Sequence, residues 1–232
     1  MYGIIALPPF DLILFDCDGV LIDSEKIATQ IESEILTDAG FPISTRDVAE
    51  RFSGKSWEQI LRDVEAESGL TLADRLATVV EDVLDERLPI EIEAISGVEE
   101  MLTGLTLPRC ICSNTKLSRI EILLDKVGLR HYFAPNIFSA KDLGPGRSKP
   151  APDVYLHGAA RMGADPARCV VVEDSVHGVM AGCAAGMTVI GFTGGGHTFS
   201  RHAANLLAAG AAMTISDMAR LPQAMADCAA RP

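Results

Sequence analysis

The sequence has few aromatic residues and no long uninterrupted hydrophobic run. Aromatic residues make up 5% of its 232 residues, and Trp57 is the single tryptophan. The most apolar later stretch, 203–215, is interrupted by Asn205 and Gly210 and is shorter than the roughly 20 residues that span a bilayer. The first residues show neither a positive charge before their apolar stretch nor a small-residue cleavage site. We therefore expect no membrane anchor and no secretory signal.

Positive charge is also scarce. The chain has 20 Lys and Arg against 32 Asp and Glu, a formal net charge of −12, and no block of basic residues. Because nucleic acids and anionic membranes are bound through clusters of Lys and Arg, we expect neither as a partner. An anionic small substrate is still compatible with this balance, since a metal ion and a few lysines can meet its charge locally.

Several motifs of other enzyme classes are missing. The six cysteines show no CxxC spacing and the five histidines form no HExxH pair, so we expect reduced thiols, a cytoplasmic protein and no zinc site. The run Gly194-Gly195-Gly196 lacks the helix pattern of a dinucleotide-binding motif and has no Walker-type lysine, so we interpret it as a flexible surface loop.

What the sequence does have is an alternation of strand and helix patterns. The apolar run 10–15, which precedes Gly19, predicts a buried parallel strand. Further strands are predicted at 108–113, 137–139, 169–173, 187–190 and 212–215, with helices at 116–127, 152–162, 175–185 and from 217 onward. This alternation predicts an α/β fold, a doubly wound parallel sheet covered by helices on both faces.

A long helical segment separates the first strand from the rest. Residues 24–88 have apolar positions at three- and four-residue spacing and no convincing strand, and we expect Pro89 to end the segment. The connection is far longer than ordinary strand-to-helix connections. We therefore predict a core domain of residues 1–23 and 90–232 and an inserted, all-helical cap of residues 24–89.

Four polar clusters lie at or just after the predicted strand ends. They are Asp16 and Asp18, Ser113-Asn114, Lys149-Pro150, and Glu173-Asp174-Ser175. The carboxyl ends of parallel strands share one edge of the sheet, so these groups can converge there. Two carboxylates as close as the first pair stay ionised only beside a cation or a shared proton, which indicates a metal site or an acid and nucleophile couple.

These residue types suit phosphoryl transfer at a magnesium site. Asp16, Asp174 and a backbone carbonyl would suffice to hold Mg²⁺, which prefers oxygen ligands. One carboxylate would attack phosphorus and a second would donate a proton to the leaving oxygen, while lysine and hydroxyl groups stabilise the phosphoryl charge. Each cluster also has a simpler interpretation, since an Asp-x-Asp-Gly turn, a solvated loop lysine and a helix cap need no ligand. The presence of four such clusters in this order favours the phosphoryl-transfer site over these simpler interpretations.

The ordered clusters resemble the haloacid dehalogenase superfamily of phosphatases and phosphomutases, specifically the branch that has a helical cap after the first strand. The resemblance implies that Asp16 is the nucleophile and Asp18 the general acid and base, which also gives Mg²⁺ a backbone carbonyl. It implies that Asp174 is a metal ligand and Glu173 a ligand or a supporting group. Ser113 and Asn114 would bind the phosphoryl group, and Lys149 would bridge it to Asp16.

The resemblance extends into the cap. Gly54, Lys55 and Ser56 resemble the substrate-specificity loop of this branch. β-Phosphoglucomutase has a histidine on the first cap helix and an arginine after the loop, and the corresponding residues here are Ala28 and Trp57. Both differences favour a hydrolase over a mutase. Trp57 itself is more typical of packing than of substrate contact.

We therefore expect a magnesium-dependent phosphatase of small phosphorylated metabolites that forms an aspartyl-phosphate. Within the branch, Asp23-Ser24-Glu25 and the run 91–95 most resemble the 6-phosphogluconate phosphatase type. A β-phosphoglucomutase-type phosphomutase is the alternative, and a binding module without activity is a third possibility. We expect a monomer or a weak homo-oligomer. Of the histidines, His177 is the one expected near the site.

Overall fold

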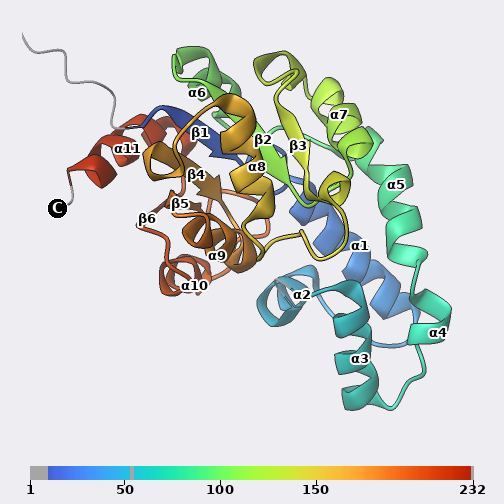
Figure 1. The fold of residues 1–232 in the computed structure, drawn as a ribbon. Helices are drawn as coiled ribbons and strands as arrows, with labels where there is room; N and C mark the ends of the chain where they lie inside the picture. Colours follow the sequence, from blue (N-terminus) through green and yellow to red (C-terminus); the bar gives the residue numbers. More distant parts are fainter. Residues whose placement is uncertain (1–9, 53–54, 231–232) are drawn as a thin grey trace, which may run out of the picture.

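A computed structural model describes residues 10–52 and 55–230, and its centre is a six-stranded parallel sheet (Figure 1). The strands follow the order β3-β2-β1-β4-β5-β6, so β1, the strand directly before Asp16, lies in the middle of the sheet. The strands are β1 (Leu12–Phe15), β2 (Arg109–Ser113), β3 (Ile137–Ser139), β4 (Cys169–Glu173), β5 (Thr188–Phe192) and β6 (Met213–Ile215). The doubly wound α/β fold expected from the sequence is confirmed.

The helices fall into two groups along the chain, those between β1 and β2 and those after β2. The segment between β1 and β2 contains α1 (Ser24–Asp38), α2 (Thr45–Phe52), α3 (Trp57–Ser68), α4 (Ala73–Leu76), α5 (Val79–Glu91) and α6 (Val98–Gly104). The remaining helices are α7 (Leu117–Lys126), α8 (Asp153–Met162), α9 (Val176–Ala184), α10 (His202–Ala208) and α11 (Leu221–Ala229). No helix in the described part of the chain combines the length and apolar character needed to cross a bilayer.

Three details differ from the sequence prediction. Pro89 was expected to end the helical segment, but α5 continues through it to Glu91. Proline lacks an N–H and disrupts the preceding turn, and the helix does end two residues later. Helices α6 and α10 were not predicted, and each is only seven residues long.

The alternation of side chains along β1 divides the core into two layers. Leu12 and Leu14 pack with apolar residues of α8, α9 and α10, whereas Ile13 and Phe15 pack with those of α6, α7 and α11. Successive strand residues point to opposite faces, so a continuous apolar run is what a strand covered on both sides requires. The strand burial therefore explains why the first motif begins with an apolar run.

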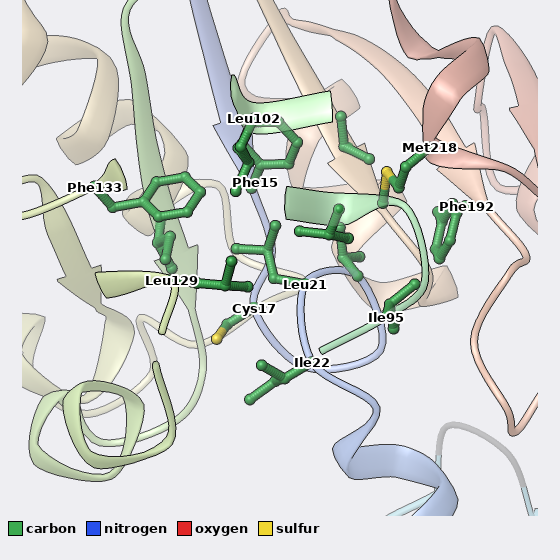
Figure 2. Packing of buried hydrophobic residues seen from close by; sticks show 14 of the residues in the cluster. Phe15, Cys17, Leu21, Ile22, Ile95, Leu102, Leu129, Phe133, Phe192 and Met218 are labelled. Atoms are coloured by element: carbon green, nitrogen blue, oxygen red, sulfur yellow. The ribbon is translucent and has the colours of Figure 1, made fainter. Parts of the chain in front are cut away.

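The loop after β1 is anchored by the same core. Figure 2 shows Cys17, Leu21 and Ile22 among the packed side chains, and all three are fully buried. Because neighbouring side chains in extended backbone alternate, burying Cys17 directs Asp16 and Asp18 away from this core. Gly19 follows with a positive φ of 72°, which lets the chain turn back so that the Gly19 amide donates to the Ile22 carbonyl at 2.8 Å.

We refer to α1–α5 as the cap helices. They enclose an apolar cluster of their own, which includes Leu36, Val48, Ile60 and Val64. Their two connections to the sheet run side by side, since the Asp23 amide donates to the Glu93 carbonyl at 3.0 Å. The figure places these helices together beyond one end of the sheet (Figure 1). The exact cap boundaries of 24 and 89 stay a prediction.

Candidate active site

A buried lysine joins two of the predicted carboxylates. Lys149 Nζ lies 2.5 Å from Asp16 Oδ1 and 2.7 Å from Glu173 Oε1. The lysine comes from the loop before α8, and the carboxylates come from the ends of β1 and β4. These strands are direct neighbours in the sheet, so the topology itself brings the residues together.

Glu173 is fully occupied by hydrogen bonds. Its Oε1 also accepts a bond from Tyr155 Oη at 2.9 Å, and its Oε2 accepts bonds from the Ser175 amide at 2.9 Å and the Ser175 hydroxyl at 3.0 Å. The residue has no solvent exposure. This bonding favours a supporting role for Glu173, in which it orients Lys149, over direct metal binding.

Asp18 lies among three hydroxyl groups. Its Oδ1 accepts a bond from Ser24 at 2.7 Å, and its Oδ2 accepts one from Thr115 at 2.8 Å and a longer one from Ser113 at 3.3 Å. Ser24 begins the first cap helix, so Asp18 touches both the sheet edge and the cap. A carboxyl group in this position can exchange a proton with a group that enters between the two.

The other predicted phosphoryl-binding residues lie at the end of β2. The Ser113 hydroxyl accepts a bond from the Thr115 amide at 3.0 Å. Asn114 accepts a bond from the Lys149 amide at 2.9 Å and donates to the Lys149 carbonyl at 3.4 Å. Both residues line the cavity described below, and the Asn114 side chain also fixes the backbone that carries Lys149.

Carboxylate oxygens gather where a cation would bind. Asp16, Glu173 and Asp174 each offer an oxygen, and these oxygens all lie within 4.8 Å of one another. Burial is the main cause that raises the pKa of Asp16, and the charges of Glu173 and Asp174 add to it, against the opposing effect of Lys149. Burial also raises the pKa of Asp174. A set of crowded, buried oxygens of this kind fits a hard divalent cation such as Mg²⁺.

Lys149 keeps its proton in this environment. Burial alone would lower its pKa, but the charges and hydrogen bonds of Asp16 and Glu173 outweigh burial and raise it. The ammonium group therefore neutralises part of the carboxylate cluster and can also meet an incoming anion.

A cavity of about 750 Å³ opens over these residues, between the sheet edge and the cap helices. Its size is in the usual range for small-molecule sites. The predicted residues Asp16, Asp18, Ser113, Asn114, Lys149, Glu173 and Asp174 all contribute to its wall. The structure thus brings together the four clusters that the sequence places far apart.

The cap contributes to the same cavity. Lys55 and Ser56 line it, and Lys55 Nζ forms an ion pair with Asp63 at 2.5 Å. Ser56 caps α3 by accepting a bond from the Gln59 amide. The predicted residue Gly54 lies outside the described residues.

Of the two cap residues that we compared with β-phosphoglucomutase, one lines the cavity and the other packs inside the cap. Ala28 lines the cavity, so a side chain of the first cap helix does reach the site. Trp57 instead packs against the cap cluster and donates from Nε1 to the Leu76 carbonyl at 2.7 Å. This contact agrees with the packing interpretation of Trp57.

Two histidines that sequence reasoning missed contact Asp174. His197 Nε2 lies 3.2 Å from Asp174 Oδ2, and His202 Nε2 lies 2.6 Å from the Asp174 carbonyl oxygen. His177, the histidine expected near the site, lines the cavity but has no described bond to these carboxylates. No signal in the sequence indicates these contacts, because both histidines follow β5, whereas Asp174 follows β4, and no local motif links the two segments.

The glycine run before His197 lies in the loop after β5, with Gly194 and Gly196 exposed and Gly195 buried, so the expected surface loop is present and its flexibility stays a prediction. A Cβ added to Gly194, Gly195 or Gly196 would lie 2.4, 3.0 or 2.7 Å from the nearest side-chain atom, which belongs to Phe192, His197 or Asp23 respectively. At Gly194 the Ser216 carbonyl oxygen would also lie at 2.6 Å, so a side chain there would require the backbone to move, whereas the nearest atoms at Gly195 and Gly196 belong to side chains. The three glycines therefore allow the loop to pass close to the site.

Arg119 and Glu25 were also not predicted. Arg119 of α7 lines the cavity and pairs with Asp85 at 2.5 Å and Glu81 at 2.9 Å, both on the cap helix α5. Glu25 lines the cavity from α1, and burial together with the charge of Asp174 raises its pKa to about 7. These residues join the cap helices to the site.

Comparisons with known proteins agree with this geometry. The model of the haloacid dehalogenase-like hydrolase family matches residues 10–186. The 6-phosphogluconate phosphatase of Escherichia coli (strain K12) is 34% identical over 81% of this chain and 84% of its own length. Hexitol phosphatase B of the same strain is 31% identical over 76% of this chain and 81% of its own length.

Solved structures give the same result. A conserved haloacid dehalogenase-like protein of Agrobacterium tumefaciens str. C58 is 55% identical, with a TM-score of 0.93 over 95% of this chain and 99% of its own. A HAD family hydrolase of Deinococcus radiodurans R1, solved with bound phosphate and sodium, is 34% identical, with a TM-score of 0.84 over 96% of this chain and 97% of its own. The family that the ordered motifs predicted is thereby confirmed, and the chain belongs to the haloacid dehalogenase-like hydrolases.

Proposed function

We propose that the enzyme is a magnesium-dependent phosphatase of small phosphorylated metabolites. The observation that carries the proposal is the meeting of Asp16, Asp174 and Lys149 at one buried sheet edge beneath a cavity. Lys149 holds Asp16 by a bond of 2.5 Å, and Asp18 lies two residues further on the same loop. The phosphatase names of two curated relatives and the phosphate bound to a structural relative support it.

In the first step, a carboxylate oxygen of Asp16 forms a bond to phosphorus while the bond from phosphorus to the leaving oxygen breaks. Asp18 gives its proton to that leaving oxygen. Lys149 and the Ser113 hydroxyl stabilise the phosphoryl charge, and Glu173 keeps the lysine in place. Bound Mg²⁺, held by Asp16, Asp174 and the Asp18 carbonyl, would neutralise charge on the phosphoryl oxygens.

In the second step, Asp18 accepts a proton from water as the water oxygen forms a bond to phosphorus. The bond between phosphorus and Asp16 breaks, which releases orthophosphate and restores the carboxylate. The hydroxyl groups of Ser24 and Thr115, each within 2.8 Å of an Asp18 oxygen, hold the side chain between these proton transfers. Each proton that Asp18 donates is thus recovered in the same cycle.

The cavity favours hydrolysis over mutase chemistry. At the position where β-phosphoglucomutase has its histidine, the first cap helix presents Ala28 to the cavity, and an alanine cannot take over the role of that histidine. For the substrate, we propose a phosphorylated sugar or sugar acid, with 6-phosphogluconate and hexitol phosphates as the first candidates. We also propose a cytoplasmic location, because Cys17, Cys110, Cys112 and Cys169 are buried thiols that form no disulfide.

The proposal is tested by phosphate release from 6-phosphogluconate, glucitol 6-phosphate, fructose 1-phosphate and β-glucose 1-phosphate, with Mg²⁺ and with a chelator. We expect activity on at least one ester, and its loss with the chelator. Asp16→Asn should lower turnover by at least about three orders of magnitude. Asp11→Asn is the matched control, since Asp11 is exposed and pairs with Arg168. Retained activity of Asp16→Asn, or conversion of β-glucose 1-phosphate to glucose 6-phosphate, would contradict the proposal.

A further inference from the structure

The side chain and the main chain of Asp174 are both held by one loop. His197 approaches the carboxylate at Oδ2, and His202 donates from Nε2 to the Asp174 carbonyl at 2.6 Å. The two histidines belong to the segment 193–202, between β5 and the start of α10. Asp174 itself is buried, so its orientation is set by these contacts and not by solvent.

The loop is fixed at both ends of this contact. The Gly196 amide donates to Asp23 Oδ1 at 2.9 Å, beside the start of the first cap helix. The Phe199 ring stacks on His202 with a centroid distance of 5.1 Å and an interplanar angle of 10°. The close approach that the three glycines permit adds to these contacts. His197 is therefore held in one position by its surroundings.

The imidazole of His197 is costly where it lies. Its side chain is 10% exposed, and Nδ1 is buried without a hydrogen-bond partner among the described residues. A buried polar atom without a hydrogen-bond partner destabilises the folded state. An apolar side chain of similar size would avoid this cost. The contact with Asp174 therefore explains why a side chain with a nitrogen donor occupies this position.

We propose that His197 is a positioning residue that limits Asp174 to one oxygen for cation binding. The inference rests on the metal site of the proposed function. Because His197 Nε2 lies 3.2 Å from Oδ2 and faces it, Oδ1 is the carboxylate oxygen left for a cation. Mg²⁺ takes single carboxylate oxygens in an octahedral arrangement, whereas Ca²⁺ often takes both oxygens of a carboxylate. His197 thereby favours a small cation over a larger one.

Removing the donor changes both affinity and selectivity. Loss of groups that orient metal ligands typically weakens metal binding about 10–100-fold. In His197→Ala the second oxygen becomes available, so Ca²⁺ binding loses less than Mg²⁺ binding. We expect the ratio of Mg²⁺ to Ca²⁺ affinity to fall by about tenfold. A residue with a purely structural role would not change this ratio.

The experiment measures Mn²⁺ binding by electron paramagnetic resonance without substrate, and obtains Mg²⁺ and Ca²⁺ affinities by competition. His197→Gln, whose amide can donate from a similar position, should keep the ratio within about threefold, which is under 1 kcal/mol. His177→Ala is the matched control for a histidine that lines the cavity but does not contact Asp174. If His197→Ala does not fold, His197→Phe fills the space without a donor and must show the same fall in the ratio.

An unchanged ratio in His197→Ala or His197→Phe would overturn the inference, as would a wild-type chain that binds none of the three cations. Failure of the proposed function is a separate result. A chain that binds Mn²⁺ through a His197-dependent site but releases no phosphate from any ester would contradict the phosphatase and leave the inference supported.

Discussion

The Lys149 ammonium lies 2.7 Å from a carboxylate oxygen of Glu173, and the two side chains are 4% and 0% exposed. With Asp16 on its other side, the lysine is the positive centre of a buried triad. Taking charges out of water is expensive, and the cost is offset only while each charge keeps its partners. Lys149, which we propose as a catalytic residue, is therefore also a structural element of the sheet edge.

Lys149→Met should destabilise the metal-free protein by about 3–5 kcal/mol, because it leaves Asp16 and Glu173 without their shared counter-ion. Chemical denaturation at pH 7 measures the free energy of unfolding. Arg46→Met is the matched control, since Arg46 pairs with Glu50 on the protein surface and exposed pairs contribute about 1 kcal/mol or less. Equal effects of the two substitutions would show that the buried triad carries no special weight.

Asp174→Asn and Glu173→Gln should affect metal binding differently. Both oxygens of Glu173 already accept hydrogen bonds, whereas the contacts of Asp174 with the described residues involve Oδ2 and its carbonyl oxygen. We expect Asp174→Asn to weaken Mg²⁺ binding at least about tenfold and Glu173→Gln to change it much less. Titration calorimetry provides the measurement. The reverse order would identify Glu173 as the direct ligand.

The sequence predicted the sheet and the convergence of its polar clusters because both follow from local patterns. Apolar runs mark β1 and β4, and polar residues directly after them must lie at the same edge. Each predicted site residue within the described ranges, from Asp16 to Asp174, lines the same cavity. A buried parallel sheet imposes strong local constraints, which is why this part could be predicted.

The contacts that come from other elements could not be predicted in the same way. His197 and His202 follow β5 and have no local motif, and Tyr155 reaches Glu173 from α8. Their positions depend on how separate elements pack, and a spacing pattern does not contain that information. The close neighbours of the glycine run could not be predicted for the same reason, because they include Asp23, far away in the sequence.

Glu32→Gln should change the pH dependence of stability. Burial and the nearby charge of Glu25 raise the pKa of Glu32 to about 8, whereas an unfolded glutamate titrates near 4.3. Between these values the folded state holds a proton that the unfolded state has lost, so this carboxyl lowers stability as pH rises. Glutamine has no such proton to lose.

The variant should therefore become more stable than wild type as the pH rises from about 4.5 to 8. The difference should be of order 2 kcal/mol at the upper end, less than the full linkage value because the side chain is partly exposed. Denaturation curves across this range provide the measurement. Glu58→Gln makes the same change at an exposed position of α3. Parallel pH curves for the two variants would contradict the prediction.

Arg119→Gln should loosen the contact between the cap helices and the core. Arg119 on α7 is 22% exposed and joins two carboxylates of α5, which are 63% and 66% exposed. Pairs of this kind contribute about 0.2–1 kcal/mol, so we expect KM to rise roughly two- to fivefold while kcat changes little. Added salt should raise the wild-type KM toward that of the variant.

Steady-state kinetics at low and high KCl concentration, on the ester that the enzyme hydrolyses best, measure this effect. Arg51→Gln is the matched control, because Arg51 pairs with Glu67 inside the cap. The two variants lose similar surface pairs, but only one pair joins the cap to the core. The same KM shift and salt dependence in both would show that the Arg119 contact has no separate role in cap position.

The cap and the core should unfold in one transition. Ile27 and Ile31 of α1 and Val80 and Leu88 of α5 belong to the same buried cluster as the core residue Phe15. A continuous apolar cluster couples the two parts, since neither can open without exposing the other. Trp57, the single tryptophan, lies in the cap and reports on it by fluorescence, while circular dichroism follows all helices. The two signals should give coincident denaturation curves.

Leu88→Ala removes part of the shared cluster. It should lower the free energy of unfolding by about 2–5 kcal/mol and bring the fluorescence transition before the dichroism transition. Separate transitions in the wild-type chain would show instead that the cap unfolds independently of the core, and that the apolar contacts between them do not couple their unfolding.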